Sequence, residues 1–327
     1  MSEFITIGEP LTTFASIDAD VDLAHAENFK KIVGGAELNV AIGVSRLGHS
    51  TEYISRVGKE PLGEFVKNQI DTNNVGSDYI SFDDQYWTGI QLKQKVTKGD
   101  PATYNFRRNS AATHLSPDII DKVDLSDVKI AHMSGIFPAI SKTAQDSFRR
   151  LFKRLNEQHI FTTFDPNLRP SLWPDEETMV KTINELATFA DVVLPGDNEG
   201  EVLVGTRDPE TIADFYLKAE RTQTVIVKVG PQGAYVKNKG EEGYFINGFK
   251  AAQVVDTVGA GDGFALGYIT ALLEGKSQKS AVMRGNAVGC LQVQTPGDND
   301  GYPTKKELAD FYATQGVEET DEITSSH

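Results

Sequence analysis

Residues 256–264, DTVGAGDGF, form the stretch that decides the fold of this chain of 327 residues. Small residues are concentrated there, as where a backbone turns tightly and approaches a ligand closely. From the last residue of this stretch onward, the apolar residues Phe264, Tyr268 and Leu272 recur at helical spacing. This places the turn at the N-terminus of a helix. Free amides at that position, aided by the helix dipole, suit a phosphate or the charge that develops during phosphoryl transfer.

Asp262 is the candidate catalytic base of this turn. A carboxylate in the first turn of the helix can accept the proton of a substrate hydroxyl as it attacks the γ-phosphorus. The amides of Gly259, Ala260 and Gly261 would stabilise the equatorial oxygens of the transferred group. The competing interpretation is a glycine-rich helix start whose aspartate binds backbone donors. Two other glycine loops are excluded, because no Lys-Ser or Lys-Thr follows at Walker A spacing and Phe264 stands where a dinucleotide fingerprint needs glycine.

The rest of the chain alternates between short apolar runs and segments of helical period. This pattern predicts an α/β fold with a doubly wound, mostly parallel sheet and helices on both faces. The expected strands are residues 4–7, 53–57, 128–133, 160–164, 192–194 and 225–229. The expected helices are residues 37–47, 62–73, 143–158, 176–189 and 209–219. No long linker interrupts the series, so residues 1–315 are predicted to form a single domain.

Two segments break the alternation and predict a small β-sheet that projects as a lid. They span about residues 10–33 and 86–108, and the second has hairpin turn chemistry around residues 98–101. A lid over the carboxyl ends of a parallel sheet would cover its binding crevice. The acidic end of the chain, residues 316–327, has no helical or strand period and is expected to be flexible.

Charge and cysteine content limit the classes of partner. Lys and Arg number 32 against 47 Asp and Glu, and the net charge of −15 opposes binding to nucleic acid or to an anionic membrane. The single cysteine, Cys290, excludes an intramolecular disulfide. No apolar run is long enough to cross a bilayer, so a cytoplasmic protein is expected.

Two separated motifs resemble the signatures of the PfkB family of ribokinase-like carbohydrate kinases. Residues 256–264 are similar to its C-terminal signature, with Val258 where Thr is more usual. Residues 34–41, GGAELNVA, followed by Arg46-Leu47-Gly48, are similar to its N-terminal signature. The resemblance covers residues 4–311. It implies a ribokinase-like fold, ATP and Mg²⁺ as cofactors with K⁺ as a further expectation, and a homo-oligomer, a dimer through the lid.

The resemblance also assigns roles to individual residues. The sugar hydroxyls are expected at Gly34, Gly35 and Asn39, where backbone amides and a side-chain amide converge on one spot. Glu201 would act through water on Mg²⁺, as the last residue of an Asn-x-x-Glu element, and Asp256 would belong to a monovalent-cation site. The expected nucleotide contacts are Asn198, Lys228, Gly230, Gly233, Thr257, Gly259, Gly261 and Asn286.

Two arginines narrow the expected substrate to a sugar acid. Guanidinium groups of Arg107, on the lid, and Arg169, after a core strand, can clamp a carboxylate by bidentate hydrogen bonds. Surface ion pairing is the alternative for each. Within the family, these arginines and the stretch that ends at Ile136, a further expected substrate contact, resemble the 2-keto-3-deoxygluconate kinases. Gln91 and Asn105 stand where those kinases commonly have tyrosines that contact the substrate.

The implied reaction is ATP-dependent phosphorylation of 2-keto-3-deoxy-D-gluconate at its primary hydroxyl, which gives the 6-phosphate. A kinase of a neutral sugar, such as fructose or ribose, is the first alternative. A non-catalytic sugar-binding protein on a kinase scaffold is the second, because fold does not fix function.

Overall fold

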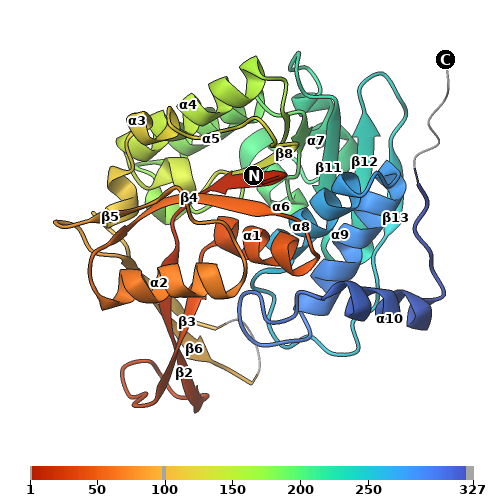
Figure 1. Ribbon diagram of the computed structural model, residues 1–327. Coiled ribbons are helices and arrows are strands. Elements are labelled where there is room, and N and C mark those ends of the chain that lie inside the picture. Colours follow the sequence, from red (N-terminus) through yellow and green to blue (C-terminus); the bar gives the residue numbers. More distant parts are fainter. Residues whose placement is uncertain (1, 98–100, 322–327) are drawn as a thin grey trace.

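The computed structural model describes residues 2–97 and 101–321, and its centre is a nine-stranded sheet between two layers of helices (Figure 1). The strand order is β13-β12-β11-β10-β9-β8-β1-β4-β5, parallel except where β12 pairs with β11 and β13. The strands are β1 (Phe4–Ile7), β4 (Thr51–Gly58), β5 (Ile80–Asp83), β8 (Ile130–Ser134), β9 (Phe161–Asp165), β10 (Val192–Val193), β11 (Thr224–Lys228), β12 (Gly233–Asn238) and β13 (Tyr244–Asn247).

Each face of the sheet packs against its own group of helices. One apolar core joins the sheet to α1 (Ala36–Arg46), α2 (Pro61–Thr72), α8 (Ala260–Leu273), α9 (Gln278–Gln292) and α10 (Lys305–Gln315). The other joins it to α3 (Pro117–Ile120), α4 (Lys142–Glu157), α5 (Glu176–Ala187), α6 (Asp197–Val204) and α7 (Pro209–Tyr216). The doubly wound architecture predicted from the sequence is thereby confirmed.

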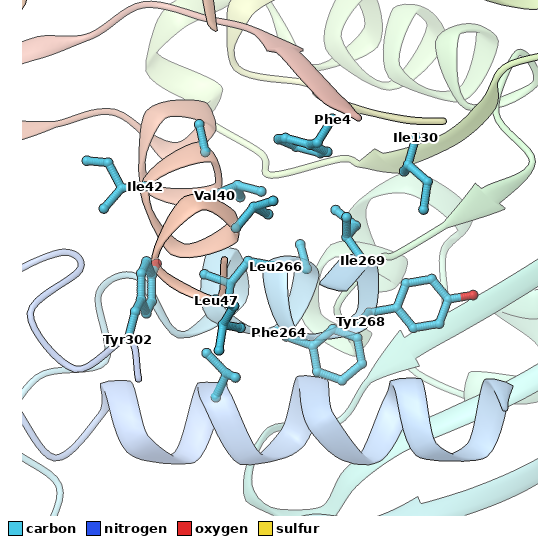
Figure 2. Packing of buried hydrophobic residues seen from close by; sticks show 14 of the residues in the cluster. Phe4, Val40, Ile42, Leu47, Ile130, Phe264, Leu266, Tyr268, Ile269 and Tyr302 are labelled. Carbon is cyan, nitrogen blue, oxygen red and sulfur yellow. The ribbon is translucent and has the colours of Figure 1, made fainter. Parts of the chain in front are cut away.

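Helices α1 and α8 pack closely against each other, and both begin at the candidate active site described below. A Cβ added at Gly43 would lie 2.1 Å from Leu266 Cδ2, so the absence of a side chain at Gly43 admits Leu266. Figure 2 shows this core, with Val40 of α1 on the side that faces Leu266 of α8. The glycine turn (residues 256–263) is therefore held in place by an apolar helix that is buried along most of its length.

A second, four-stranded sheet projects from the main body and is called the lid sheet here (Figure 1). Its order is β3-β2-β6-β7, and the strands are β2 (Leu11–Ala19), β3 (Phe29–Gly34), β6 (Gly89–Lys95) and β7 (Thr103–Phe106). The two segments that broke the sequence alternation thus form one separate sheet, as predicted. Of the predicted hairpin turn at residues 98–101, residues 98–100 lie outside the described residues.

At the carboxyl end of the chain, residues 317–321 make specific contacts, whereas a flexible tail was predicted over residues 316–327; for the rest of that segment flexibility stays a prediction. Helix α10 ends at the left-handed cap Gly316, and residues 317–321 then pack against α9. Glu319 accepts a hydrogen bond from Arg284 Nε at 2.7 Å and one from the Tyr312 hydroxyl at 2.6 Å. The buried Arg284, together with Ser280 and Lys276, therefore holds an acidic segment without periodicity, while residues 322–327 lie outside the described residues. None of the described helices combines the length and the apolar character that crossing a membrane requires.

Candidate active site

A cavity of about 1540 Å³ lies at the carboxyl ends of the central strands. The strand order reverses between β1 and β8, and such a switch point is where open α/β sheets bind ligands. The wall of the cavity runs from the lid sheet, past the glycine turn, to the loops after β10 and β11. This volume exceeds that of an ordinary single-ligand pocket, so two ligands can lie end to end.

Asp262 lies in this wall, between the side lined by the lid sheet and the side lined by the loops after β10 and β11. Its Oδ2 accepts a hydrogen bond from Asn39 Nδ2 at 3.0 Å, and its Oδ1 accepts one from Asn167 Nδ2 at 3.4 Å. Burial raises the pKa of Asp262 to about 6, partly offset by the Asn39 hydrogen bond, while the nearby Asp165 raises it further. The carboxylate is thus ionised at neutral pH and oriented by two amides.

The amide of Asn39 is itself oriented by a further residue. Asn299 Nδ2 donates to Asn39 Oδ1 at 3.0 Å, which leaves the Nδ2 group of Asn39 directed at Asp262. Arg46, at the end of the same helix α1, donates from Nη1 to the carbonyl oxygens of Asn299 at 2.9 Å and Tyr302 at 3.1 Å. Both ends of the N-terminal motif therefore act on the site from one helix.

The glycine turn has the backbone conformation that only glycine adopts readily. Gly259 is the N-cap of α8 with φ 80°, and a Cβ added there would lie 2.0 Å from the carbonyl oxygen of Asp298. Tyr302 donates its hydroxyl to the Gly259 carbonyl at 2.8 Å. The Ala260 amide donates to Thr257 O at 3.3 Å, so the helix start offers the amides of Gly261 and Asp262 to an anion.

The lid side of the cavity carries the predicted sugar contacts. Asn39, Gln91, Asn105, Arg107 and Ile136 all line the wall. Gly35 also lines it, with φ 122° and its Cα so close to the chain that a Cβ would lie 2.7 Å from Glu9 O. Gly34 lies behind it at the end of β3 and is not part of the wall that the described residues form.

Arg107 already has a carboxylate partner within the protein. Its Nε and Nη2 lie 2.7 Å and 2.5 Å from Oε2 of the buried Glu9, and Ser110 donates to Glu9 Oε1 at 2.5 Å. Two of the three guanidinium nitrogens are thus directed at Glu9 rather than at a ligand. Arg169 is exposed, lines the cavity, and its Nη1 donates to the carbonyl of Leu168 at 2.9 Å.

Glu37 adds a second buried acid beside this pair. Burial raises the pKa of Glu37 to about 8, and the positive charge of Arg107 offsets this only in part. At neutral pH its carboxyl group is therefore mostly protonated and can donate a hydrogen bond.

The nucleotide side of the cavity corrects one metal prediction. Glu201 is exposed, its Oε2 pairs with Arg207 Nε at 2.6 Å, and it does not line the cavity. Glu199 lines it instead, and its two oxygens accept hydrogen bonds from the amides of Leu168 at 2.9 Å and Gly196 at 2.7 Å. The physical reason is position in α6: Glu199 occupies the third helical position and turns back to cap the helix, whereas Glu201 points to solvent.

Lys228 supplies the positive charge on this side. Its Nζ lies 2.6 Å from Asp165 Oδ2, and a Cβ added at Gly261 would lie 3.7 Å from it. Burial alone lowers the pKa of Lys228, but Asp165 and Glu199 outweigh burial and raise it, so the side chain stays charged. The other predicted nucleotide contacts in the wall are Asn198, Gly230, Gly233, Thr257, Gly259, Gly261 and Asn286.

Asp256 lies just behind the wall and not in it, as far as the described residues show. Its Oδ2 lies 2.8 Å from Nζ of Lys93, and its Oδ1 accepts a hydrogen bond from the Val258 amide at 3.0 Å. The predicted role in a monovalent-cation site stays a prediction, with an ammonium group beside that carboxylate.

Sequence reasoning missed several polar residues that the fold brings to the site. They are Asp165, Asn167, Glu199, Lys93 and Asn299, which lie near Asp262 or support its neighbours. Asp165 and Asn167 had a usable signal, because they directly follow a buried strand in the same stretch as Arg169. Lys93 and Asn299 had none, since their partners are 163 or more positions away in the chain.

Comparison with known proteins identifies the family. The model of the pfkB family carbohydrate kinases matches residues 1–305. The chain belongs to this family. It is 44% identical over 312 residues to the 2-dehydro-3-deoxygluconokinase of Bacillus subtilis, with 95% of each chain covered. It is 30% identical over 310 residues to an Arabidopsis thaliana protein named probable fructokinase-6, chloroplastic, covering 92% of this kinase and 80% of the plant protein.

Solved structures share the whole fold of this carbohydrate kinase. A PfkB protein from Polaromonas sp. JS666 has a TM-score of 0.86 at 38% identity, covering 94% of this chain and 99% of that one. A ribokinase II candidate from Escherichia coli, solved with ATP and Mg²⁺, has a TM-score of 0.86 at 25% identity, covering 96% and 100%. The ribokinase-like fold and the carbohydrate kinase activity predicted from the two motifs are thus confirmed.

Proposed function

We propose that this kinase transfers the γ-phosphoryl group of ATP to the primary hydroxyl of 2-keto-3-deoxy-D-gluconate and forms the 6-phosphate. One observation carries the proposal: Asp262 lies at the N-terminus of α8, where the sugar side and the nucleotide side of the cavity meet. The 44% identity to a protein named 2-dehydro-3-deoxygluconokinase supports the choice of sugar. The 30% identity to a named fructokinase keeps a neutral sugar as the second candidate.

Asp262 accepts the hydroxyl proton in the proposed reaction. The hydrogen bonds from Asn39 and Asn167 hold its carboxylate in one orientation, and its pKa of about 6 leaves it ionised at neutral pH. The amides of Gly261 and Asp262 and the ammonium of Lys228 lie where negative charge on the transferred group would develop. Fixed donors of this kind stabilise a loose transition state without reorganising.

Mg²⁺ would be held mainly by the ATP phosphates and by water. Among the described residues there is no group of three or more His, Cys, Asp or Glu that could hold a metal ion by itself. The cavity wall does offer oxygen atoms of Asp197, Asn198 and Glu199, and Mg²⁺ commonly keeps several waters beside one carboxylate. The residues present therefore fit a water-mediated ion, which neutralises phosphate charge when bound.

The substrate carboxylate is assigned to Arg169. Arg107 is engaged by Glu9, so its role is to shape the sugar side and to leave Nη1 for a ligand. Gln91 Nε2 donates to Asn105 Oδ1 at 3.0 Å, and this amide pair stands in the wall where tyrosines would otherwise contact the sugar. Amides can hydrogen-bond the sugar hydroxyls but give less apolar contact.

A panel of sugars and sugar acids with ATP and Mg²⁺ tests the substrate, together with Arg169→Ala. We expect turnover of 2-keto-3-deoxygluconate, and an increase in its KM of about 10- to 100-fold in the variant, because a charge-assisted hydrogen bond contributes ~1.5–3 kcal/mol. Turnover of a neutral sugar should not change in the variant. A wild-type preference for fructose or ribose would contradict the sugar-acid proposal, and ligand-induced stabilisation without product would indicate a binding protein.

Substitutions of the two glutamates of α6 test the Mg²⁺ assignment, with Glu201 as the matched control for Glu199. We expect Glu199→Gln to raise the Mg²⁺ concentration needed for half-maximal ATP binding by about 10-fold, as loss of outer-sphere partners does elsewhere. Glu201→Gln should leave it unchanged, because Glu201 is exposed and pairs with Arg207. Calorimetric titration of ATP at several Mg²⁺ concentrations measures both, and equal effects of the two substitutions would refute the assignment.

The pH dependence of kcat/KM reports on Asp262. Its carboxylate must be ionised to accept a proton, and burial raises its pKa to about 6. Activity should therefore be lost as pH falls below about 6 and should level off above it, with one proton involved. A profile that stays flat down to pH 5 would show that this carboxyl is not the base.

The oligomeric state and the cellular location stay predictions. The edges of the lid sheet are β3 and β7, and Tyr104 and Phe106 of β7 are exposed, which suits pairing with a second copy. Sedimentation would decide whether the kinase is a dimer. A cytoplasmic location is likewise expected for an enzyme that uses ATP.

A further inference from the structure

Lys93 connects the lid sheet to the glycine turn through two buried carboxylates. It lies on β6, and its Nζ is 2.8 Å from Asp256 Oδ2 and 2.8 Å from Asp298 Oδ1. Asp256 begins the glycine turn, and Asp298 belongs to the loop after α9. All three side chains are buried. Three segments distant in sequence thus meet at one ammonium group.

This arrangement depends strongly on the lysine. Two carboxylates that face each other away from water repel, and removing the ammonium between them leaves buried charge uncompensated. Burial alone lowers the pKa of Lys93, but Asp298 and Asp256 outweigh burial and raise it above the usual value. The ammonium is therefore charged wherever the lid sheet occupies the position seen here.

Both aspartates contact the backbone of the glycine turn, Asp256 through its carboxylate and Asp298 through its main-chain carbonyl oxygen. Asp256 Oδ1 accepts a hydrogen bond from the Val258 amide at 3.0 Å. The carbonyl of Asp298 lies against Gly259, where a Cβ would be 2.0 Å away. Gln292 ties the two segments together, because its Nε2 donates to Val258 O at 3.2 Å and to Gly297 O at 2.7 Å. A shift of either aspartate would therefore move the anion-binding amides of the glycine turn.

We propose that Lys93 is a positioning residue that aligns the anion-binding amides of the turn when the lid sheet is in place. The inference rests on the proposed phosphoryl transfer at this turn. Its consequence is a link between the sugar side and the phosphate side of the cavity: displacement of the lid sheet withdraws the ammonium and lets the turn relax. ATP bound without a sugar under the lid sheet would then meet an incompletely aligned site, which limits its hydrolysis.

The alternative role is direct binding of the sugar, because Lys93 also lines the cavity. The two roles predict different kinetics. A group that binds substrate equally in the ground and transition states changes KM, whereas a group that aligns the transition-state donors changes kcat.

Lys93→Met, with Lys95→Met as the matched control, tests the proposal. Lys95 lies on the same strand but is exposed. We expect Lys93→Met to lower kcat about 10²-fold, the cost of a misplaced catalytic group, with KM for the sugar changed less than about threefold. Lys93→Arg should recover part of kcat because it keeps the charge. Propylammonium should raise the rate of Lys93→Ala and leave Lys95→Ala unaffected. An increase in KM at constant kcat, or an unchanged kcat, would overturn the proposal.

Hydrogen exchange gives a readout that does not require turnover. The amides of residues 256–263 should exchange at least about 10-fold faster in Lys93→Met than in the wild type or in Lys95→Met, because opening the turn becomes less costly. Unchanged exchange in this peptide would overturn the role of Lys93 even if the sugar substrate were misassigned. If Lys93→Met does not fold, the same comparison is made with Lys93→Gln, which removes the charge but stays polar, and unchanged exchange together with unchanged kcat in that variant would overturn the proposal.

Discussion

Replacement of Asp262 by Asn is expected to lower kcat by about 10³- to 10⁴-fold, near the upper limit of what a general base contributes. The change removes the proton acceptor but keeps the shape of the side chain and an oxygen for Asn39 Nδ2, which lies 3.0 Å from Asp262. In the proposed complex ATP contacts other groups, the amides of the turn and Lys228 among them, so its binding should be nearly unchanged. Steady-state kinetics and calorimetric titration of ATP measure the two quantities.

The outcome separates catalysis from support of the fold. Asn39→Asp would add a carboxylate next to Asp262 and is a poor control, whereas Asn167→Ala removes the weaker contact, at 3.4 Å, and leaves the base in place. That variant should lose far less activity than Asp262→Asn. Near-normal turnover in Asp262→Asn would contradict the assignment of the base, and loss of ATP binding would indicate that the substitution had disturbed the turn.

Replacement of Gly259 by Ala is expected to have the second large effect, on both activity and stability. The position has φ 80°, which costs a residue with a side chain about 1–2 kcal/mol, and the new Cβ would lie 2.0 Å from Asp298 O. Backbone on both sides must move, so we expect a fall in kcat of at least about 10²-fold and a lower melting temperature.

Gly240 provides the matched control for this substitution. It has the same φ of 80°, but a Cβ added there meets no atom within 4 Å. Gly240→Ala should therefore show the conformational cost alone: stability lower by about 1 kcal/mol and kcat unchanged. If the two variants lost equal stability and Gly259→Ala kept its kcat, the close contact with Asp298 would not be what constrains the turn.

The sequence predicted the architecture because buried parallel strands are short apolar runs between amphipathic helices. Strands β1, β4, β8, β9, β10 and β11 and helices α1, α2, α4, α5 and α7 were all expected within a few residues of their observed bounds. The antiparallel strand β12 and the edge strand β13 were not predicted, because their apolar runs, residues 234–236 and 244–246, are only three residues long. The short strand β5 at the other edge of the sheet was not predicted either, because it has no long apolar run.

The site was predicted less completely, for two physical reasons. The choice between Glu199 and Glu201 depends on where α6 begins, because two positions on a helix turn a side chain by about 200°. The capping position gave a usable signal for Glu199. By contrast, the pairing of Arg107 with Glu9 joins residues 98 positions apart, and no local pattern indicates that an arginine expected to bind a ligand is already paired.

The hydrogen bond between Asn39 and Asp262 spans 223 positions of the chain and has a consequence for the protein during its synthesis. At ordinary translation speeds, Asn39 is made about 10 to 45 s before Asp262. Through this interval α1 lacks α8, the helix it packs against, and the proposed base does not yet exist. With Asp262 as the proposed base, the nascent chain is expected to consume no ATP until Asp262 and α8 have been made.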